Sequence, residues 1–359
     1  MSILQRMTQL ITVLVAVFYI SACSGEKRPD TIYIGGRIYT GNPEAPIAEA
    51  VGTIKARIVY VGDANGIVGD THPTTKLVDL NGQVMYPGLI NTHTGALVEG
   101  LDDTAGSQIE AAAIEYAKMG WTTLHAFNVV PENVRIMEDL AMSGKLPVRI
   151  YNVLNQAGFE SLVSYGPGVS PGGLVETRTV LIDTAQPFDQ FVETGETPSL
   201  EEAMKLALKS HVQLVFKVQT IEFDQLLDNI EIAFHDALPD ADPRWRILAD
   251  DALSPALIER AKSLGLEVER SGELKFEDIF SKDTKLENYT TGAAYVGFRQ
   301  DMIGSIEVGK LADFTIMNGD LFAAASESDA ANDIRPVMTI IGGAQAWPRP
   351  EKSLPVFGQ

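Results

Sequence analysis

The stretch Met85-Tyr86-Pro87-Gly88-Leu89-Ile90-Asn91-Thr92-His93-Thr94-Gly95 decides the fold of this chain. An apolar strand leads through Pro87-Gly88 into a second run that carries a single histidine. Side chains at positions i and i+2 of a strand point to the same side, so His93 and Gly95 share one face. Two histidines in this spacing would bind one metal ion together, but here only one imidazole stands on that face.

The middle of the chain alternates between helices and strands. A helix predicted over 107–119 ends at Gly120, and a strand over 121–127 follows. The same order recurs three times. A helix over 131–143 precedes a strand over 148–154, and a helix over 254–264 precedes a strand over 266–269. Between these units, a capping box at Ser199–Glu202 begins a helix that extends to Ser210 and is followed by a strand over 212–218. Such repeated units predict an α/β fold with a TIM-type (β/α) barrel. No eighth strand is evident between Ser271 and Asn288, so we predict an abridged or distorted barrel.

Both ends of the chain are rich in short β runs separated by glycine turns. Near the N-terminus they cover 31–40, 53–63 and 76–80, a pattern typical of an antiparallel meander. Near the C-terminus they cover 304–316 and 337–343. We interpret the glycine-punctuated run Gly304–Ile316 as a structural strand pair rather than a catalytic segment.

Together, the Pro87-Gly88 strand with its histidine and the run Gly304–Phe314 resemble the amidohydrolase superfamily, in particular its amidase and deformylase-like branch. The resemblance implies that both chain ends build one small β-sandwich beside the barrel. It assigns residues 30–86 and 300–359 to that composite sandwich and residues 87–299 to the barrel. It also implies a metal-bound water whose pKa the metal lowers toward 7.

Most metal-ligand positions of that family carry other residues here. By resemblance, the second histidine of the family's first strand aligns with Gly95. The aspartate that precedes the first histidine in the family aligns with Asn91. The strand over 177–183 contains no lysine, the histidines of the fifth and sixth strands align with Gln219 and Ala249, and no Gly-Ser-Asp marks the general base. Zinc needs three or four ligands in fixed geometry, so His93 alone does not hold it.

A makeshift metal site is the remaining option within the barrel. Its candidate ligands are His93, His125, Asp183 and Asp250, and Gln219 is a candidate pocket residue. The alternative for His125 is a hydrogen-bonded histidine in a partly polar barrel mouth. No Gly-x-Ser-x-Gly elbow is present, and no catalytic residue is assigned.

The first residues have the pattern of a bacterial lipoprotein signal. Arg6 precedes a short apolar run over 10–20, and Ile20-Ser21-Ala22 leads to Cys23, the only cysteine. We predict a signal peptide over 1–22, lipidation of Cys23 and a tether over 23–29. The usual sorting preference of such lipoproteins places the protein in the cell envelope, on the periplasmic face of the outer membrane.

Composition limits the partners. The formal net charge of −20 argues against nucleic acid, which needs a basic surface. We expect the lipid anchor to insert in the membrane and a small-molecule ligand to be a possible partner. The sequence does not indicate an oligomeric state.

Two functions remain open from the sequence, besides a decaying gene product without a stable fold. The first is a membrane-tethered pseudoenzyme that keeps the amidohydrolase fold, needs no cofactor and serves in binding or interaction. The second is a hydrolase of amide or other non-peptide C–N bonds that uses zinc or another divalent metal in an altered or sparse site. Whether the chain is an enzyme depends on the choice between them.

Overall fold

The computed structural model describes residues 28–349 except 68, 70, 96, 187–197, 220–221, 236–241, 250–252, 271–278, 280–284 and 325–332. The signal peptide, Cys23, most of the tether, Asp250 and the last ten residues of the chain lie outside the described residues. None of the helices described is long and apolar enough to cross a membrane.

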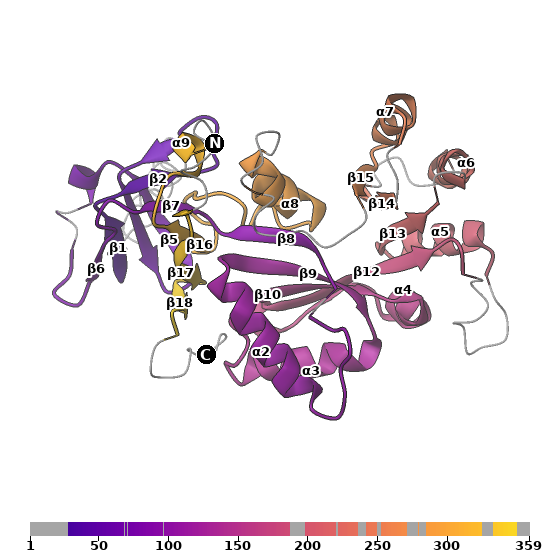
Figure 1. Cartoon of the computed structure of the whole chain (residues 1–359), viewed down its shortest axis with the longest axis horizontal. Coiled ribbons are helices and arrows are strands. Elements are labelled where there is room, and N and C mark those ends of the chain that lie inside the picture. Colours follow the sequence, from indigo (N-terminus) through magenta and orange to yellow (C-terminus); the bar gives the residue numbers. More distant parts are fainter. Residues whose placement is uncertain are drawn as a thin grey trace, which may run out of the picture.

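The largest sheet is a parallel, TIM-like half-barrel that fills the centre and right of Figure 1. Its strands pair in the order β15-β14-β13-β12-β10-β9-β8. Their bounds are β8 (Leu89–Thr94), β9 (Trp121–Val129), β10 (Arg149–Leu154), β12 (Val175–Asp183), β13 (Gln213–Val218), β14 (Arg246–Ala249) and β15 (Glu267–Arg270), with a two-residue β11 (Gly168–Val169) antiparallel to β12. Within the described part of the chain β15 does not pair with β8, so the barrel is open.

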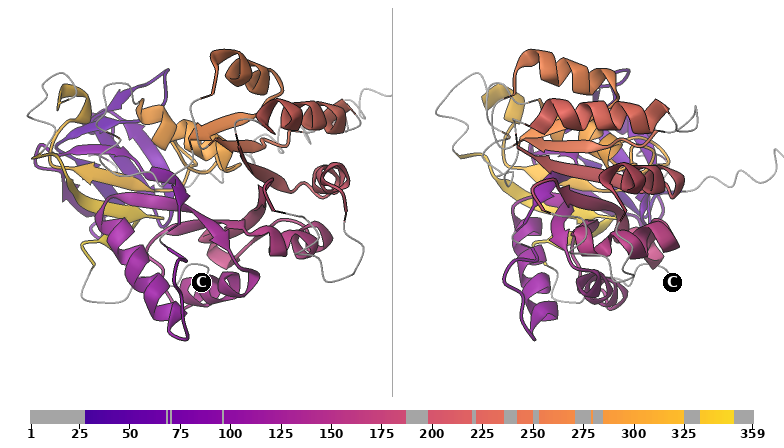
Figure 2. Two further views of the ribbon diagram at one scale, coloured as in Figure 1. Left: turned by 45° about the vertical axis from the view of Figure 1, so that its right-hand side comes forward. Right: turned by 90° about the vertical axis from the view of Figure 1, so that its right-hand side faces the viewer.

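Helices cover the outer face of this sheet, as the two rotated views in Figure 2 show. They are α2 (Ala105–Lys118), α3 (Pro131–Met142), α4 (Phe159–Tyr165), α5 (Leu200–Lys209), α6 (Phe223–His235) and α7 (Pro255–Ser263). The predicted capping box is present, since the Ser199 hydroxyl accepts from the Glu202 N–H at the start of α5. Gly120 and Gly144 follow α2 and α3 with positive φ, as helix ends favour.

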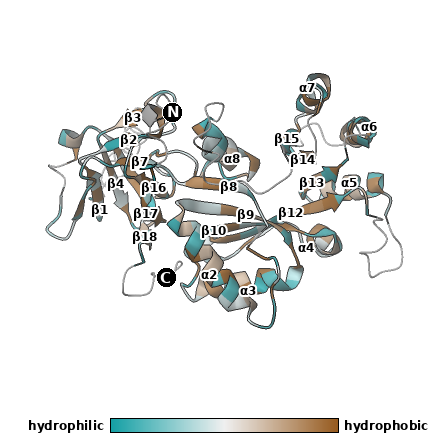
Figure 3. Cartoon of the chain, viewed as in Figure 1, coloured by the Kyte–Doolittle hydropathy of each residue, from teal (hydrophilic) through white to brown (hydrophobic). Residues whose placement is uncertain are grey.

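Each helix buries an apolar face against the strands. In α2, Ile109, Ala113 and Ala117 are fully buried at a spacing of four residues, which places them on one side of the helix. Figure 3 shows the apolar colouring of β8, β12 and β13 and the mixed colouring of α2 and α3. Burial of these faces is the main source of stability for helices of this length.

Two mixed sheets stand beside the half-barrel, at the left of Figure 1. One has the order β5-β4-β1-β6 and the other β18-β17-β16-β7-β2-β3. The first comprises β1 (Thr31–Ile34), β4 (Ala50–Ile54), β5 (Arg57–Gly62) and β6 (Lys76–Asp79), and the second β2 (Arg37–Tyr39), β3 (Ile47–Ala48), β7 (Val84–Pro87), β16 (Phe314–Met317), β17 (Pro336–Ile341) and β18 (Ala344–Trp347). Residues of both sheets share one apolar core, in which Tyr33 meets Phe314 edge to face at 5.5 Å.

The expectation of a purely antiparallel meander at the N-terminal end is wrong. β1 pairs with β6 in parallel, and β2 pairs with β7 in parallel. A parallel pair needs a long crossover between its strands, and more than forty residues separate the two members of each pair. The antiparallel hairpin of β4 and β5, which turns at Lys55, is the part of this region that follows the prediction.

A buried ion pair joins the six-stranded sheet to the half-barrel. The Arg149 guanidinium, at the start of β10, donates to both carboxylate oxygens of Asp313 at 2.6 and 2.9 Å. The same carboxylate accepts from the Gly342 N–H at 2.7 Å. The side chains of Arg149 and Asp313 are 7% and 3% exposed, so this contact links the barrel to the six-stranded sheet away from solvent.

The short helix α8 (Thr291–Val296) covers the concave side of the half-barrel. Its Ala293 and Ala294 pack on Ile90 of β8, and the carbonyl of Val296 accepts from the Gln213 amide of β13 at 3.0 Å. Gly297 then passes so close to His125 that an added Cβ would lie 3.2 Å from the imidazole Nε2. The part of the barrel interior next to α8 is therefore filled by protein.

Candidate functional site

An open depression of about 560 Å³ lies where the strands of the half-barrel end. Its walls come from the last residues of the strands and from the loops that follow them, which is where α/β barrels carry their ligand sites. Its described lining residues are His93, Gly95, Val98, Glu99, Phe127, Asn128, Asn155, Gln156, Leu181, Asp183, Gln186, Lys217 and Leu248.

His93 stands in this wall at the end of β8. Its ring stacks on Phe127 with 4.1 Å between ring centroids. Its backbone N–H donates to the side-chain oxygen Oδ1 of Asn91 at 3.0 Å. The imidazole Nδ1 is buried without a hydrogen-bond partner. Burial, followed by the positive charge of Arg246, lowers the pKa of His93 to about 4, so the ring is neutral at pH 7.

Asp183 and Lys217 form an ion pair in the wall. The Lys217 ammonium lies 3.4 Å from the Asp183 carboxylate, and both side chains are partly exposed. Asp183 also accepts from the Ala185 N–H at 3.1 Å. These two charges balance each other, and the exposed carboxylate of Glu99 adds a negative charge to the described lining.

Two amide side chains after β10 are incompletely hydrogen-bonded. The side-chain oxygen of Asn155 is buried without a partner, and so are both the oxygen and the nitrogen of the Gln156 amide. Gln156 is 5% exposed and opens the short 3-10 helix Gln156–Gly158. Buried polar atoms are nearly always paired in proteins, so such a cluster calls for an explanation.

Beneath the depression, a fully buried arginine occupies the barrel interior. Arg246 of β14 donates to Glu269 of β15 through Nε and Nη2 at 2.8 and 2.7 Å, and to the Thr92 carbonyl at 2.7 Å. Its Nη1 lies 3.4 Å from Nδ1 of His125, and its guanidinium lies 5.1 Å from the centre of the Phe127 ring. A fixed positive charge thus stands beside both barrel histidines.

His125 lies one layer deeper than His93. It is 2% exposed and stacks on Tyr151 with 4.5 Å between ring centroids. Burial and the charge of Arg246 lower the pKa of His125 well below its usual range. His125 is therefore a neutral, packed interior residue and does not line the depression.

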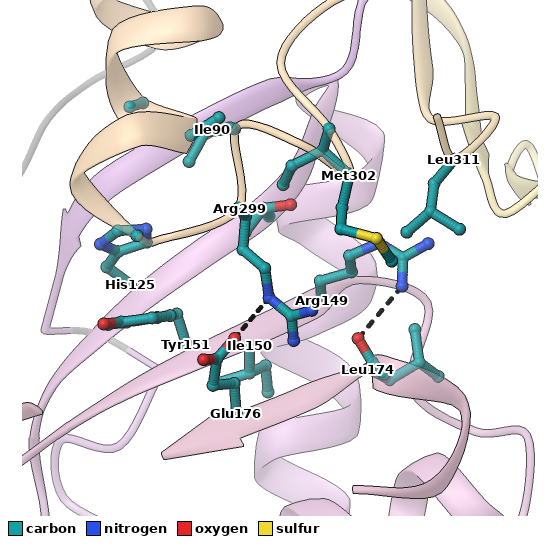
Figure 4. Close-up of a pocket in the computed structure, with 16 residues that line it drawn as sticks. Ile90, His125, Arg149, Ile150, Tyr151, Leu174, Glu176, Arg299, Met302 and Leu311 are labelled. Carbon is teal, nitrogen blue, oxygen red and sulfur yellow. Dashed lines mark hydrogen bonds and ion pairs between the residues drawn. The ribbon is translucent and has the colours of Figure 1, made fainter. Parts of the chain in front are cut away.

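A second, inner cavity of about 20 Å³ lies under α8, at the opposite end of the strands. Figure 4 shows its polar wall, where Arg299 forms an ion pair with Glu176 and Arg149 donates to the Gly173 carbonyl at 3.2 Å. This volume accommodates about one water molecule. The cavity is a packing gap in the barrel interior, and the depression at the strand ends is the candidate site.

The predicted site residues separate in space. His93 and Asp183 both line the depression, whereas His125 lies below it and Gln219 is exposed beyond the end of β13, away from the lining. Asp250 is outside the described residues. On β14, Leu248 rather than Ala249 faces the depression.

Sequence reasoning missed the buried charge and the amides. Arg246 is not among the predicted site residues, because its burial beside two histidines depends on how the half-barrel folds. A clue was present in the alternation of β14, where Arg246 and Leu248 share one face. For Gln156 the sequence held no signal, because an unpaired amide is visible only once the neighbours are placed.

The described donor set does not fit a metal ion. No group of three or more histidine, cysteine, aspartate or glutamate side chains suited to a metal occurs in the described ranges. Apart from Gly95 and its chain neighbours, no described atom lies within 4 Å of the place where a Cβ at Gly95 would stand, so no described side chain takes the place of the second histidine. His93 alone, beside a fixed guanidinium, is not a zinc site.

Comparison with known proteins gives one family match. Residues 280–346 match the model of the amidohydrolase family. The chain is also 31% identical over 149 residues to an exoenzymes regulatory protein, AepA, of Pectobacterium carotovorum subsp. carotovorum, in a match that covers 36% of this chain. That match spans only 32% of the relative's own length.

Solved structures share the fold over most of the chain. An uncharacterized metal-dependent hydrolase from Pyrococcus furiosus has a TM-score of 0.63 at 12% identity, covering 81% of this chain and 99% of that one. The atrazine chlorohydrolase TrzN from Arthrobacter aurescens TC1, complexed with zinc, has a TM-score of 0.59 at 13% identity, covering 87% and 93%. At these identities the likeness concerns the fold.

Proposed function

We propose that this chain, which has the metal-dependent hydrolase fold of the amidohydrolase superfamily, acts as a binding protein rather than as a hydrolase. In this proposal the depression at the strand ends takes up a small molecule without cleaving it. The chain is tethered to the bacterial cell envelope through lipid on Cys23. We expect it to work without a metal cofactor.

The buried guanidinium of Arg246 is the observation that carries this proposal. It stands beside His125 at 3.4 Å, and its charge adds to burial, the larger cause, in lowering the pKa of both barrel histidines. A positive charge that disfavours a proton on His93 also disfavours a divalent cation on the same imidazole. Glu269 offsets part of this effect, and its carboxylate is held by the guanidinium rather than offered to a metal.

The form of the depression supports a binding role. It is larger than a water-sized gap, and its largely polar lining also carries apolar side chains such as Phe127 and Leu248. Its volume of about 560 Å³ lies in the range of small-molecule sites. Since the strand ends hold the walls in place, the site does not depend on a metal for its shape.

A hydrolase with a sparse metal site is the second candidate. The observation in its favour is that His93 and Asp183 line the same depression and that Nδ1 of His93 has no partner. An imidazole and a carboxylate together are typical zinc ligands. This candidate needs further ligands from water or substrate.

Metal analysis distinguishes the two. The full chain is purified without chelators, its metal content is measured by mass spectrometry, and hydrolysis of N-acyl amino acids is followed with added zinc or manganese. We expect less than about 0.1 equivalent of metal and no hydrolysis, since tight binding takes several oriented ligands. One equivalent of zinc that His93→Ala abolishes, and that the exposed-loop control His72→Ala retains, would establish the hydrolase instead.

A further inference from the structure

We propose that Gln156 determines the specificity of the depression, and that its side-chain amide binds an uncharged ligand in which an N–H donor stands beside a carbonyl acceptor. This inference rests on the proposed binding function and adds the chemistry of the ligand. It concerns a residue on the loop after β10, away from the positions that carry metal ligands in the family resemblance.

The unpaired amide of Gln156 is the first argument. Gln156 lines the depression and is 5% exposed, yet neither its Oε1 nor its Nε2 has a hydrogen-bond partner. Leaving one polar atom unpaired in a protein interior is unfavourable, and here two belong to one group. A partner that arrives with the ligand would offset this penalty.

The other buried glutamine of the half-barrel shows what a structural role looks like. The Gln213 oxygen accepts from the Thr179 hydroxyl at 2.7 Å and the Tyr151 hydroxyl at 3.2 Å. Its nitrogen donates to the carbonyls of Arg244 at 2.6 Å and Val296 at 3.0 Å. Gln213 is fully paired within the protein, so the contrast with Gln156 reflects the site and not the residue type.

Ligand access requires only a side-chain movement. The amide atoms of Gln156 are closed off from solvent in the structure, but because they make no hydrogen bond, rotating the amide toward the depression breaks none. The backbone is held meanwhile, since Asn155 N–H donates to the Val129 carbonyl and Gly158 N–H to the Asn155 carbonyl, both at 2.9 Å. Gln156 can therefore reorient on a fixed support.

The ligand's chemistry follows from what the walls offer. A carboxamide presents a donor and an acceptor side by side and pairs with an edge that presents the reverse. Asp183 and Lys217 balance each other, and the exposed carboxylate of Glu99 is the other charge in the described lining. Phe127, Leu181 and Leu248 add apolar contact. An uncharged lactam or amide edge on a flat apolar body pairs with the Gln156 amide and with the apolar wall, whereas Glu99 disfavours an anion.

Three small probes test the inference on the purified full chain. They are 2-pyridone, which has the paired N–H and carbonyl, N-methyl-2-pyridone, which has lost the N–H, and benzoate, which is flat but charged. Ligand-observed NMR titrations report weak affinities of fragments of this size. We expect 2-pyridone to bind at least about tenfold more tightly than either of the others, because the methylated and charged probes can accept from Gln156 Nε2 but offer no donor and leave its Oε1 unpaired.

Two matched variants complete the experiment. Gln156→Met keeps the volume and removes the amide, so we expect the preference for 2-pyridone to disappear while the melting temperature stays level or rises. Gln213→Met is expected to lower the melting temperature and to retain the preference. A preference that survives Gln156→Met overturns the inference, and so does a melting temperature that falls in Gln156→Met as in Gln213→Met.

The results of these experiments distinguish a failure of the role of Gln156 from a failure of the proposed binding function. If all three probes bind equally well to a metal-free chain, the binding function stands and the role of Gln156 is wrong. If one equivalent of zinc copurifies and N-acyl substrates are cleaved, the binding function is wrong. If none of the probes binds at about 10 mM, where fragments of this size are expected to register, the assigned ligand chemistry is wrong.

Discussion

Replacing Arg246 with methionine should be among the most damaging single changes in this chain. The guanidinium is completely buried and makes charged hydrogen bonds to Glu269 at 2.7 and 2.8 Å and one to the Thr92 carbonyl at 2.7 Å. Methionine fills much of the volume but leaves the Glu269 carboxylate without its counter-ion. Removing one partner of a fully buried pair costs about 3–5 kcal/mol, and because the Glu269 side chain is 21% exposed, we expect Arg246→Met to lower the free energy of unfolding by an amount at the lower end of that range.

Urea unfolding followed by circular dichroism measures this loss, and two further variants make it specific. Arg260→Met removes a partly exposed arginine that contacts three carboxylates, including Asp228, and should cost much less than Arg246→Met because pairs at the surface contribute little. The double variant Arg246→Met with Glu269→Gln should recover part of the loss, since no unpaired charge remains.

Two results would refute the reasoning about Arg246. One is a loss under about 1 kcal/mol for Arg246→Met, which would mean that the interior is wet enough to solvate Glu269. The other is additivity of the two single changes, which would mean that the guanidinium and the carboxylate do not interact.

Two other predictions concern pH and the anchor. The folded-state pKa of His93, about 4, lies below the unfolded value of 6.5, so its stabilising effect is complete above pH 6.5 and is lost as pH falls toward 4, with a slope of up to about 1.4 kcal/mol per pH unit. His93→Gln should reduce this slope in urea titrations between pH 7 and pH 4, and an unchanged slope would contradict the assignment. For the anchor, Cys23→Ala should release the protein from the membrane fraction or leave the precursor uncut, and unchanged size and fractionation would remove the lipoprotein prediction.

Local patterns predicted the elements of the barrel well. The capping box at Ser199–Glu202 and the proline at Pro131 mark helix starts in the structure as they do in the sequence. Gly120 and Gly144 mark the ends of α2 and α3. These signals act within one helical turn, so they are readable without knowledge of the rest of the fold.

Long-range pairing was less predictable. The parallel pairs β1·β6 and β2·β7 depend on which strands meet after a long connection, and short β runs do not encode their partner. The site shows the same limit. His93 was identified from its place in a strand, whereas the burial of Arg246 and the unpaired amide of Gln156 arise from neighbours far away in sequence.

The pairing of β7 with β16 has a consequence for how the chain folds. The Leu89 N–H, at the entrance to the half-barrel, donates to the hydroxyl of Thr315, and these two residues stand 226 positions apart. During synthesis the first strands of the six-stranded sheet emerge long before their antiparallel partners, and loop closure over such a span is slow. Until then β7 has an unpaired edge open to other chains. The interval before residues 314–317 arrive is therefore the period in which the edge of β7 is open to pairing with other chains.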